Sequence, residues 1–154
     1  RKTAVLFEAG TRLGAIISES DTAIEKAMAE FGLHLGIAFQ MIDDALDYGS
    51  SDVDIGKNIG DDLAEGKPTL PIIRAMQQCE DKQKNLLRSV IEKGGTDDIE
   101  QVLEIIQATD AIDYTFKLAE LEADKAIEAL KVIPESSFKE ALIALANYAV
   151  KRNY

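Results

Sequence analysis

Several residue types that define other protein classes are scarce or absent in this 154-residue chain. It has a single cysteine, Cys79, so an internal disulfide is excluded and a reducing compartment, the cytoplasm, is expected. Lys and Arg (17) are outnumbered by Asp and Glu (28), the net charge is −11, and no run of basic residues occurs. Nucleic acid and anionic membrane surfaces are bound through basic patches, so neither is expected as a partner.

Long apolar runs are also missing. The longest stretch without Asp, Glu, Lys or Arg covers residues 31–42, which is 12 residues. A helix that spans a bilayer needs about 20 apolar residues, so this stretch predicts a core helix and no membrane span. Hydrophobic residues make up 46% of the chain. At this length they can form a packed core, which argues against disorder.

The sequence has no strand signal, because it lacks hairpin dipeptides and any sustained alternation of apolar and polar residues. Apolar residues instead recur at helical spacing, as they do on one arc of the first segment: Val5, Leu6, Ala9, Leu13, Ile16 and Ile17. The pattern predicts an all-α fold with helices over about 1–17, 22–47, 70–78, 82–93, 97–109 and 110–131, and a last helix after Pro134.

Asp97 is followed three residues later by Glu100, which predicts a capping box at the start of a helix.

Residue 1 is Arg, and the helical pattern has already begun there, so we expect the chain to be part of a longer one.

Residues 49–66 contain four glycines and no helical period, which predicts a long mobile loop. Two known loop motifs do not fit it. An EF-hand loop that starts at Asp52 would have Lys57 at its glycine position. A P-loop is excluded because five residues, one too many, separate Gly60 from Gly66.

The most informative residues are three acids at the end of the second predicted helix: Asp43, Asp44 and Asp47, here called the aspartate stripe. At 3.6 residues per turn they share one helix face with Gln40. Carboxylates this close repel one another and also oppose the helix macrodipole, so a cation is expected to offset them. Magnesium is the natural candidate because it takes oxygen ligands and bridges carboxylates to phosphates. The alternative is a solvated acidic helix end.

The order of motifs resembles the trans-isoprenyl (polyprenyl) diphosphate synthase family. Lys2-Thr3 resembles its Lys-Thr motif, FQMIDDALDY (39–48) its second aspartate-rich motif, and DIGKNIGDDLAEGKPTLP (54–71) its lid. The sequence of these motifs most resembles that of the long-chain bacterial members that make octaprenyl diphosphate. The resemblance covers the whole chain and implies that residues 1–154 are the C-terminal portion of one synthase domain. Its fold would be part of a helical bundle around a central cavity.

The resemblance implies a transferase of isoprenoid biosynthesis. Such an enzyme elongates a prenyl chain by condensing isopentenyl diphosphate with an allylic diphosphate through a magnesium-assisted allylic carbocation. It also implies a homodimer and a product destined for a quinone side chain, as in ubiquinone biosynthesis. The family's first aspartate-rich motif is missing from this chain, so we expect the 154 residues alone to be inactive.

The resemblance assigns the metal to the aspartate stripe. Asp43 would be the principal magnesium ligand, and Asp44 and Asp47 would complete the motif directly or through water. Lewis-acid metals and lysine charges help a diphosphate to leave, and a dry apolar cavity protects the resulting cation from water.

Five further residues receive roles from the resemblance. Lys2 and Lys57 would contact the allylic diphosphate, Thr3 and Gln40 would lie beside the carbocation, and Phe39 would shape the isopentenyl side of the pocket. Each has a simpler alternative in the residues themselves, because both lysines could be solvated surface residues and Phe39 could belong to the core.

Other interpretations remain open at this point. One is a non-catalytic helical subunit or interaction domain that retains the motif. Another is terpene cyclisation, which uses a similar ionisation but is disfavoured by the Lys-Thr motif and the GKPTLP segment (66–71). His34 and Cys79 have no catalytic or metal-ligating neighbours in the sequence, so a structural histidine and an inert thiol are predicted.

Overall fold

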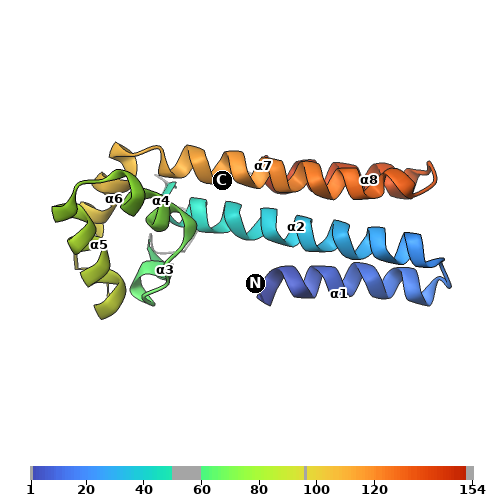
Figure 1. Ribbon diagram of the computed structural model, residues 1–154, viewed down its shortest axis with the longest axis horizontal. Coiled ribbons are helices and arrows are strands. Elements are labelled where there is room, and N and C mark those ends of the chain that lie inside the picture. Colours follow the sequence, from blue (N-terminus) through green and yellow to red (C-terminus); the bar gives the residue numbers. More distant parts are fainter. Residues whose placement is uncertain (1, 50–59, 96, 152–154) are drawn as a thin grey trace. The chain divides into compact units, whose positions relative to one another are not determined.

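The computed structural model describes residues 2–49, 60–95 and 97–151, and every regular element within these ranges is a helix (Figure 1). The chain divides into two compact units: unit 1 runs up to Ile42 and resumes at Lys117, and unit 2 covers Asp43–Phe116. No helix in these ranges has the length and apolarity needed to cross a membrane. The elements are α1 (Lys2–Ile17), α2 (Thr22–Gly49), α3 (Asp61–Ala64), α4 (Leu70–Gln78), α5 (Asp81–Lys93), α6 (Ile99–Ala108), α7 (Ala111–Ala129), the short 3-10 helix η2 (Leu130–Val132) and α8 (Ser137–Val150).

In unit 1, α2 lies between α1 and the hairpin formed by α7 and α8 (Figure 1). Its core residues come from α2, α7, η2 and α8: Phe31, Leu35, Ala126, Leu130, Ala146 and Ala149. The buried residues of α2 include Phe31, Leu35, Ala38, Ile42 and Ala45. The apolar part of α2 is thus buried, as its sequence predicts.

Helix α1 lies unusually close to α2. A Cβ atom on Gly36 would stand 2.7 Å from the Cα atom of Ala4, and one on Gly32 would overlap the Thr11 hydroxyl. Only glycine therefore fits at these two positions of α2. The Thr11 hydroxyl donates to the carbonyl oxygen of Met28 at 2.6 Å, which fixes the two backbones side by side.

Unit 2 holds α3–α6 together with the end of α2 and the start of α7. Arg74 of α4 forms a bidentate ion pair with Asp110, with N–O distances of 2.8 and 2.7 Å, and its guanidinium lies 4.3 Å from the ring centre of Tyr114. These contacts join α4 to the start of α7. The core residues of the unit are Tyr48, Leu63, Ile72, Ala75, Cys79, Leu87, Val90, Val102, Ile105, Ile106 and Ala111.

The all-α prediction is confirmed, and most predicted boundaries agree with the structure to within two residues. Within the predicted loop 49–66, residues 61–64 form the short helix α3, while 50–59 lie outside the described residues. The capping box predicted for Asp97 is wrong: α6 begins at Ile99, and its N-cap is Asp98, whose side chain makes no capping bond. A capping box exists instead at the start of α5, between Glu80 and Gln83, where the backbone N–H of Glu80 donates to the side-chain oxygen of Gln83 at 3.2 Å.

Candidate functional site

The aspartate stripe and Gln40 lie in the last three turns of α2, and all four side chains are half-buried. The helix continues to Gly49, so the three- and four-residue spacings that place these side chains on one face are those of an α-helix. Its last turn carries no basic residue. The negative end of the helix and the carboxylates therefore add to one another, and the stripe attracts cations.

In unit 1 the structure brings together two of the predicted site residues, Thr3 and Gln40. The Thr3 hydroxyl donates to the amide oxygen of Gln40 at 2.9 Å, although the two residues are 37 positions apart. Lys2, one residue earlier in α1, is exposed. Phe39 is half-buried, and its ring centre lies 5.7 Å from that of Phe7. Its described contact is thus a packing contact between α2 and α1.

In unit 2 the end of α2 is fixed to the segment that follows it. The carboxylate of Asp47 accepts the backbone N–H of Asp62 at 3.3 Å, and the backbone oxygen of Asp47 accepts the N–H of Gly60 at 3.1 Å. These bonds bring residues 60–62 against the last acid of the stripe. Lys57 lies outside the described residues.

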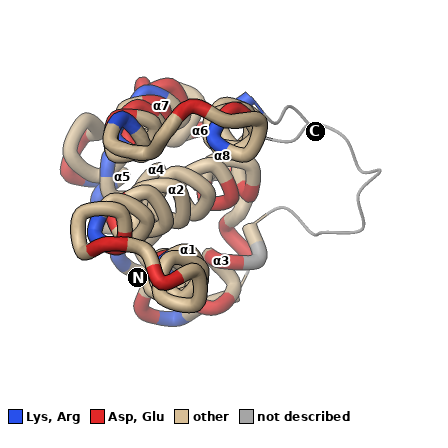
Figure 2. The backbone as a smooth tube through the Cα atoms, turned by 90° about the vertical axis from the view of Figure 1, so that its right-hand side faces the viewer, with Lys and Arg blue, Asp and Glu red and all other residues tan. Residues whose placement is uncertain are grey.

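Lys67, in the GKPTLP segment, forms ion pairs with two acids of this neighbourhood. Its ammonium lies 2.9 Å from a carboxylate oxygen of Asp62 and 2.7 Å from one of Glu65. The hydrogen bonds to Glu65 and Asp62 raise the pKa of Lys67 above its usual range. Asp62 belongs to α3, and Figure 2 shows acidic positions in red on the backbone near this helix. The GKPTLP motif is evident in the sequence, but its pattern alone assigns no role to Lys67.

Tyr48, which directly follows the stripe, is buried in the unit 2 core. Its phenol oxygen accepts a hydrogen bond from the hydroxyl of Thr69 at 3.2 Å. Burial raises the pKa of Tyr48 well above its usual range, the bond from Thr69 lowers it somewhat, and the carboxylate of Asp47 raises it further. Thr69 is the N-cap of α4, yet its side chain makes no capping bond. The hydroxyl that could cap α4 is used to join α4 to α2.

The donor chemistry of the stripe fits magnesium. Asp43, Asp44 and Asp47 offer only oxygen ligands, and magnesium usually takes one or two carboxylates, keeps several waters and binds phosphate oxygens. Among the described residues, no group of three His, Cys, Asp or Glu side chains is placed to hold a metal ion by itself, and this includes the three acids of the stripe.

A second cluster of charged side chains lies in unit 1, between α2 and α7. His34 Nδ1 donates to a carboxylate oxygen of Glu122 at 2.7 Å, and Lys125 Nζ donates to the other oxygen at 2.6 Å. Burial alone raises the pKa of Glu122, but the hydrogen bonds from Lys125 and His34 outweigh it and lower that pKa. His34 thus has a partner 88 residues away that no local sequence pattern could reveal.

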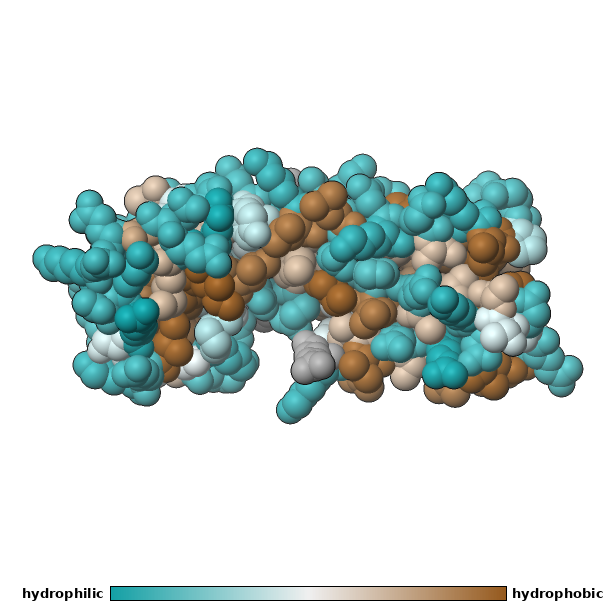
Figure 3. Space-filling view, in the orientation of Figure 1, coloured by the Kyte–Doolittle hydropathy of each residue, from teal (hydrophilic) through white to brown (hydrophobic). Residues whose placement is uncertain are grey.

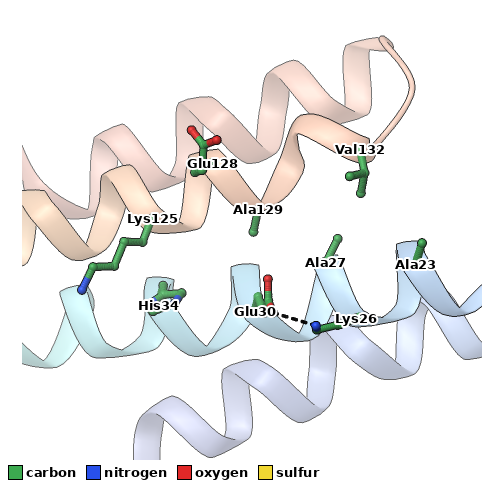
Figure 4. Close-up of a pocket in the computed structure, with 9 residues that line it drawn as sticks. All are labelled: Ala23, Lys26, Ala27, Glu30, His34, Lys125, Glu128, Ala129 and Val132. Carbon is green, nitrogen blue, oxygen red and sulfur yellow. Dashed lines mark ion pairs between the residues drawn. The ribbon is translucent and has the colours of Figure 1, made fainter.

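Next to this cluster, a groove of about 410 Å³ opens between α2 and α7 (Figure 4). Basic and acidic side chains alternate along it, and Lys26 and Glu30 form an ion pair at 3.9 Å. Diphosphate binding requires an excess of positive charge, so this groove is a poor match for that ligand. The lining residues are Ala23, Lys26, Ala27, Glu30, His34, Lys125, Glu128, Ala129 and Val132.

The described elements are all helical, and the aspartate stripe lies near the end of the longest of them, α2. The polyprenyl synthetase family model matches residues 1–108. The chain belongs to the polyprenyl synthetase family.

Curated relatives and solved structures agree with this assignment. The chain is 47% identical over 154 residues to octaprenyl diphosphate synthase of Haemophilus influenzae, with 99% of this chain and 47% of that protein covered. It is 46% identical over 151 residues to the geranyl-diphosphate-specific all-trans-nonaprenyl-diphosphate synthase of Rhodobacter capsulatus, with 98% and 46% covered. The crystal structure of a polyprenyl synthase from Caulobacter crescentus, complexed with calcium and isoprenyl diphosphate, matches with a TM-score of 0.89 and 40% identity over 98% of this chain and 47% of that one. The chain spans about half the length of the curated relatives it matches.

Proposed function

We propose that the chain forms the C-terminal portion of a chain-elongating prenyltransferase, which condenses isopentenyl diphosphate with an allylic diphosphate. The observation that carries the proposal is the aspartate stripe at the end of α2, in a chain whose curated relatives are named as polyprenyl diphosphate synthases. The hydrogen bond between Thr3 and Gln40 supports it, because the two residues given neighbouring roles in the sequence are in contact.

In this proposal the stripe binds magnesium, with Asp43 as the principal ligand and Asp44 and Asp47 completing the set. Magnesium, when bound, supplies Lewis-acid assistance to the departure of diphosphate. Asp47 is held in place by the N–H of Asp62, which preorganises its carboxylate before any ligand arrives. The solved relative from Caulobacter crescentus, described as complexed with calcium and isoprenyl diphosphate, supports a divalent cation together with an isoprenyl diphosphate ligand.

The remaining roles concern the substrates. Lys2 and Lys57 contact the allylic diphosphate, and Thr3 and Gln40 lie beside the allylic cation. The bond that Thr3 donates fixes the side-chain amide of Gln40, so that its orientation does not have to be established during the reaction. Phe39 shapes the isopentenyl side of the pocket, and its ring is supported by Phe7.

Four finer points rest on the family resemblance. We propose that the product is a long prenyl chain for a quinone side chain, that the enzyme is a homodimer, and that it works in the cytoplasm.

We also propose that the 154 residues alone do not catalyse prenyl transfer. Incubation of the purified chain with magnesium, an allylic diphosphate and radiolabelled isopentenyl diphosphate should yield no labelled prenyl product. Turnover by the chain alone would contradict its proposed inactivity.

Titration calorimetry tests the proposed metal and diphosphate site directly. Inorganic diphosphate should bind the 154-residue chain only when magnesium is present, and Asp43→Asn should weaken that binding by roughly tenfold or more. Asp124→Asn is the matched control, because it removes the same charge from an exposed position of α7 and should leave the titration unchanged. If the two variants weaken magnesium-dependent binding equally, or if neither does, the stripe is not the diphosphate site, and the non-catalytic helical subunit is the better description.

A further inference from the structure

Helix α3 is a single turn, which is not stable by itself, so contacts with the rest of unit 2 hold it in place. Leu63 is fully buried in the unit 2 core, and the carbonyl oxygen of Ala64 accepts the N–H of Gly95, just beyond α5, at 3.0 Å. Hydrophilic residues (teal) cover much of the surface over α5 in Figure 3. One buried side chain anchors the turn but leaves its orientation free, so hydrogen bonds and ion pairs set that orientation.

A Schellman motif closes the turn. Gly66, at a φ of 69°, donates its N–H to the carbonyl oxygen of Leu63 at 2.8 Å. The N–H of Lys67 donates to the carbonyl oxygen of Asp62 at 2.9 Å, which completes the motif. A Cβ atom on Gly66 would stand 2.7 Å from the carbonyl oxygen of Ile91, so glycine is needed there for space as well as for φ. The motif brings Lys67 back against the turn that it follows.

Lys67 and Asp62 are therefore joined twice. Besides the backbone bond, the Lys67 ammonium lies 2.9 Å from a carboxylate oxygen of Asp62. The backbone N–H of Asp62 in turn donates to the carboxylate of Asp47 at 3.3 Å. A continuous series of contacts thus leads from the ammonium of Lys67, through the turn, to the last acid of the aspartate stripe.

We propose that Lys67 is a positioning residue of the aspartate stripe, which acts through Asp62 to set the direction in which the Asp47 carboxylate faces. The proposal rests on the proposed function, in which Asp47 takes part in binding magnesium with a diphosphate. A carboxylate binds a metal best when its neighbours already hold it in the required orientation. The competing role for Lys67 is direct contact between its ammonium and the diphosphate.

Titration calorimetry with inorganic diphosphate and magnesium separates the two roles. Lys67→Met removes the ammonium and keeps the length of the side chain, whereas Asp62→Asn breaks the ion pair and leaves Lys67 charged. Each should weaken binding at least about threefold, and the double variant should bind no more weakly than Lys67→Met alone. If Lys67 contacts diphosphate directly, Asp62→Asn leaves binding unchanged or makes it tighter, and either result overturns the proposal.

Glu65→Gln is the matched control. Glu65 pairs with the same ammonium at 2.7 Å, but its side chain is 65% exposed, so its loss should leave diphosphate binding within about twofold of that of the unchanged chain. Lys67→Arg keeps the cation and should retain binding to the same extent. Equal weakening by Glu65→Gln and Asp62→Asn overturns the proposal, because the loss of any nearby acid would then have the same effect.

Amide hydrogen exchange provides a readout that does not depend on diphosphate. In Lys67→Met the backbone N–H of Asp62 should exchange at least about threefold faster than in the unchanged chain. The N–H of Cys79, which donates to the carbonyl oxygen of Ala75 at 2.9 Å, should exchange at the same rate in both. An unchanged rate at Asp62 overturns the proposal even if Lys67→Met binds diphosphate more weakly. An unchanged chain that binds no diphosphate with magnesium contradicts the proposed function itself, and this proposal with it.

Discussion

The hydroxyl of Thr69 donates a hydrogen bond to the phenol oxygen of Tyr48 at 3.2 Å, inside the core of unit 2. Tyr48 is the residue after the aspartate stripe, and Thr69 is the residue before α4. The bond therefore connects the helix that carries the acids to the GKPTLP segment. With the two bonds that Asp47 accepts from residues 60 and 62, it makes the end of α2 an integral part of unit 2.

The first prediction concerns that bond. Tyr48→Phe keeps the ring but leaves the buried Thr69 hydroxyl without its acceptor, so the free energy of unfolding in urea should fall by about 1–2 kcal/mol. Adding Thr69→Val to this variant removes the stranded hydroxyl and should recover part of the loss. The exposed Tyr148→Phe serves as control and should be neutral. A Tyr48→Phe chain as stable as the unchanged protein would show that the bond contributes nothing.

The second prediction concerns the close approach of α1 and α2. Gly36→Ala places a Cβ atom 2.7 Å from the backbone of Ala4, which forces the helices apart, so it should destabilise the chain by about 1–3 kcal/mol. Gly10→Ala is the matched control on α1, where a Cβ atom meets nothing within 4 Å. That change should be neutral or stabilise by up to about 1 kcal/mol through helix propensity. Thermal unfolding of the two variants measures the difference, and equal melting temperatures would refute the tight contact.

The third prediction concerns pH. The pKa of Glu122 is lower in the folded chain than its ordinary value of 4.5, so its bonds to Lys125 and His34 stabilise the fold above that pH. The stabilisation is lost as the pH falls through the folded pKa. Glu122→Gln should lower the free energy of unfolding by about 1 kcal/mol at pH 7 and should flatten its decline between about pH 5 and 3.

Glu128→Gln provides the control for that experiment. Glu128 is mostly exposed and pairs with the exposed Lys131 at 2.7 Å, so its loss should change stability by less than about 0.5 kcal/mol at any pH. Parallel stability curves for Glu122→Gln and the unchanged chain over the acid range would contradict the predicted linkage.

The fourth prediction concerns Thr3. Thr3→Val keeps the shape of the side chain but removes the donor to the amide oxygen of Gln40, and should cost about 1 kcal/mol of stability in urea. Thr3→Ser restores the hydroxyl and should recover most of the loss. A Thr3→Val chain as stable as the unchanged protein would show that the hydrogen bond to Gln40 contributes nothing.

The helices and the aspartate stripe could be predicted because helix formation depends on residues three and four positions apart. The start of α6 could not be placed correctly from Asp97 and Glu100, because two neighbouring acids, Asp97 and Asp98, both suit a helix start by residue type. The short helix α3 could not be predicted because an isolated single turn of helix is unstable, so local spacing does not reveal it. In the structure this turn lies where the backbone N–H groups of Gly60 and Asp62 donate to Asp47.

The sequence by itself determined the all-α class, the acid-bearing face of α2 and the membership of the polyprenyl synthetase family, because each depends on local spacing or on motif order. Only the tertiary structure decided which residues distant in the sequence meet, such as His34 with Glu122 and Tyr48 with Thr69. It also decided which side of α1 faces α2. An amphipathic pattern alone indicates that the leucines face a core, but the close contact between Ala4 and Gly36 turns the small side inward and leaves the leucines outside.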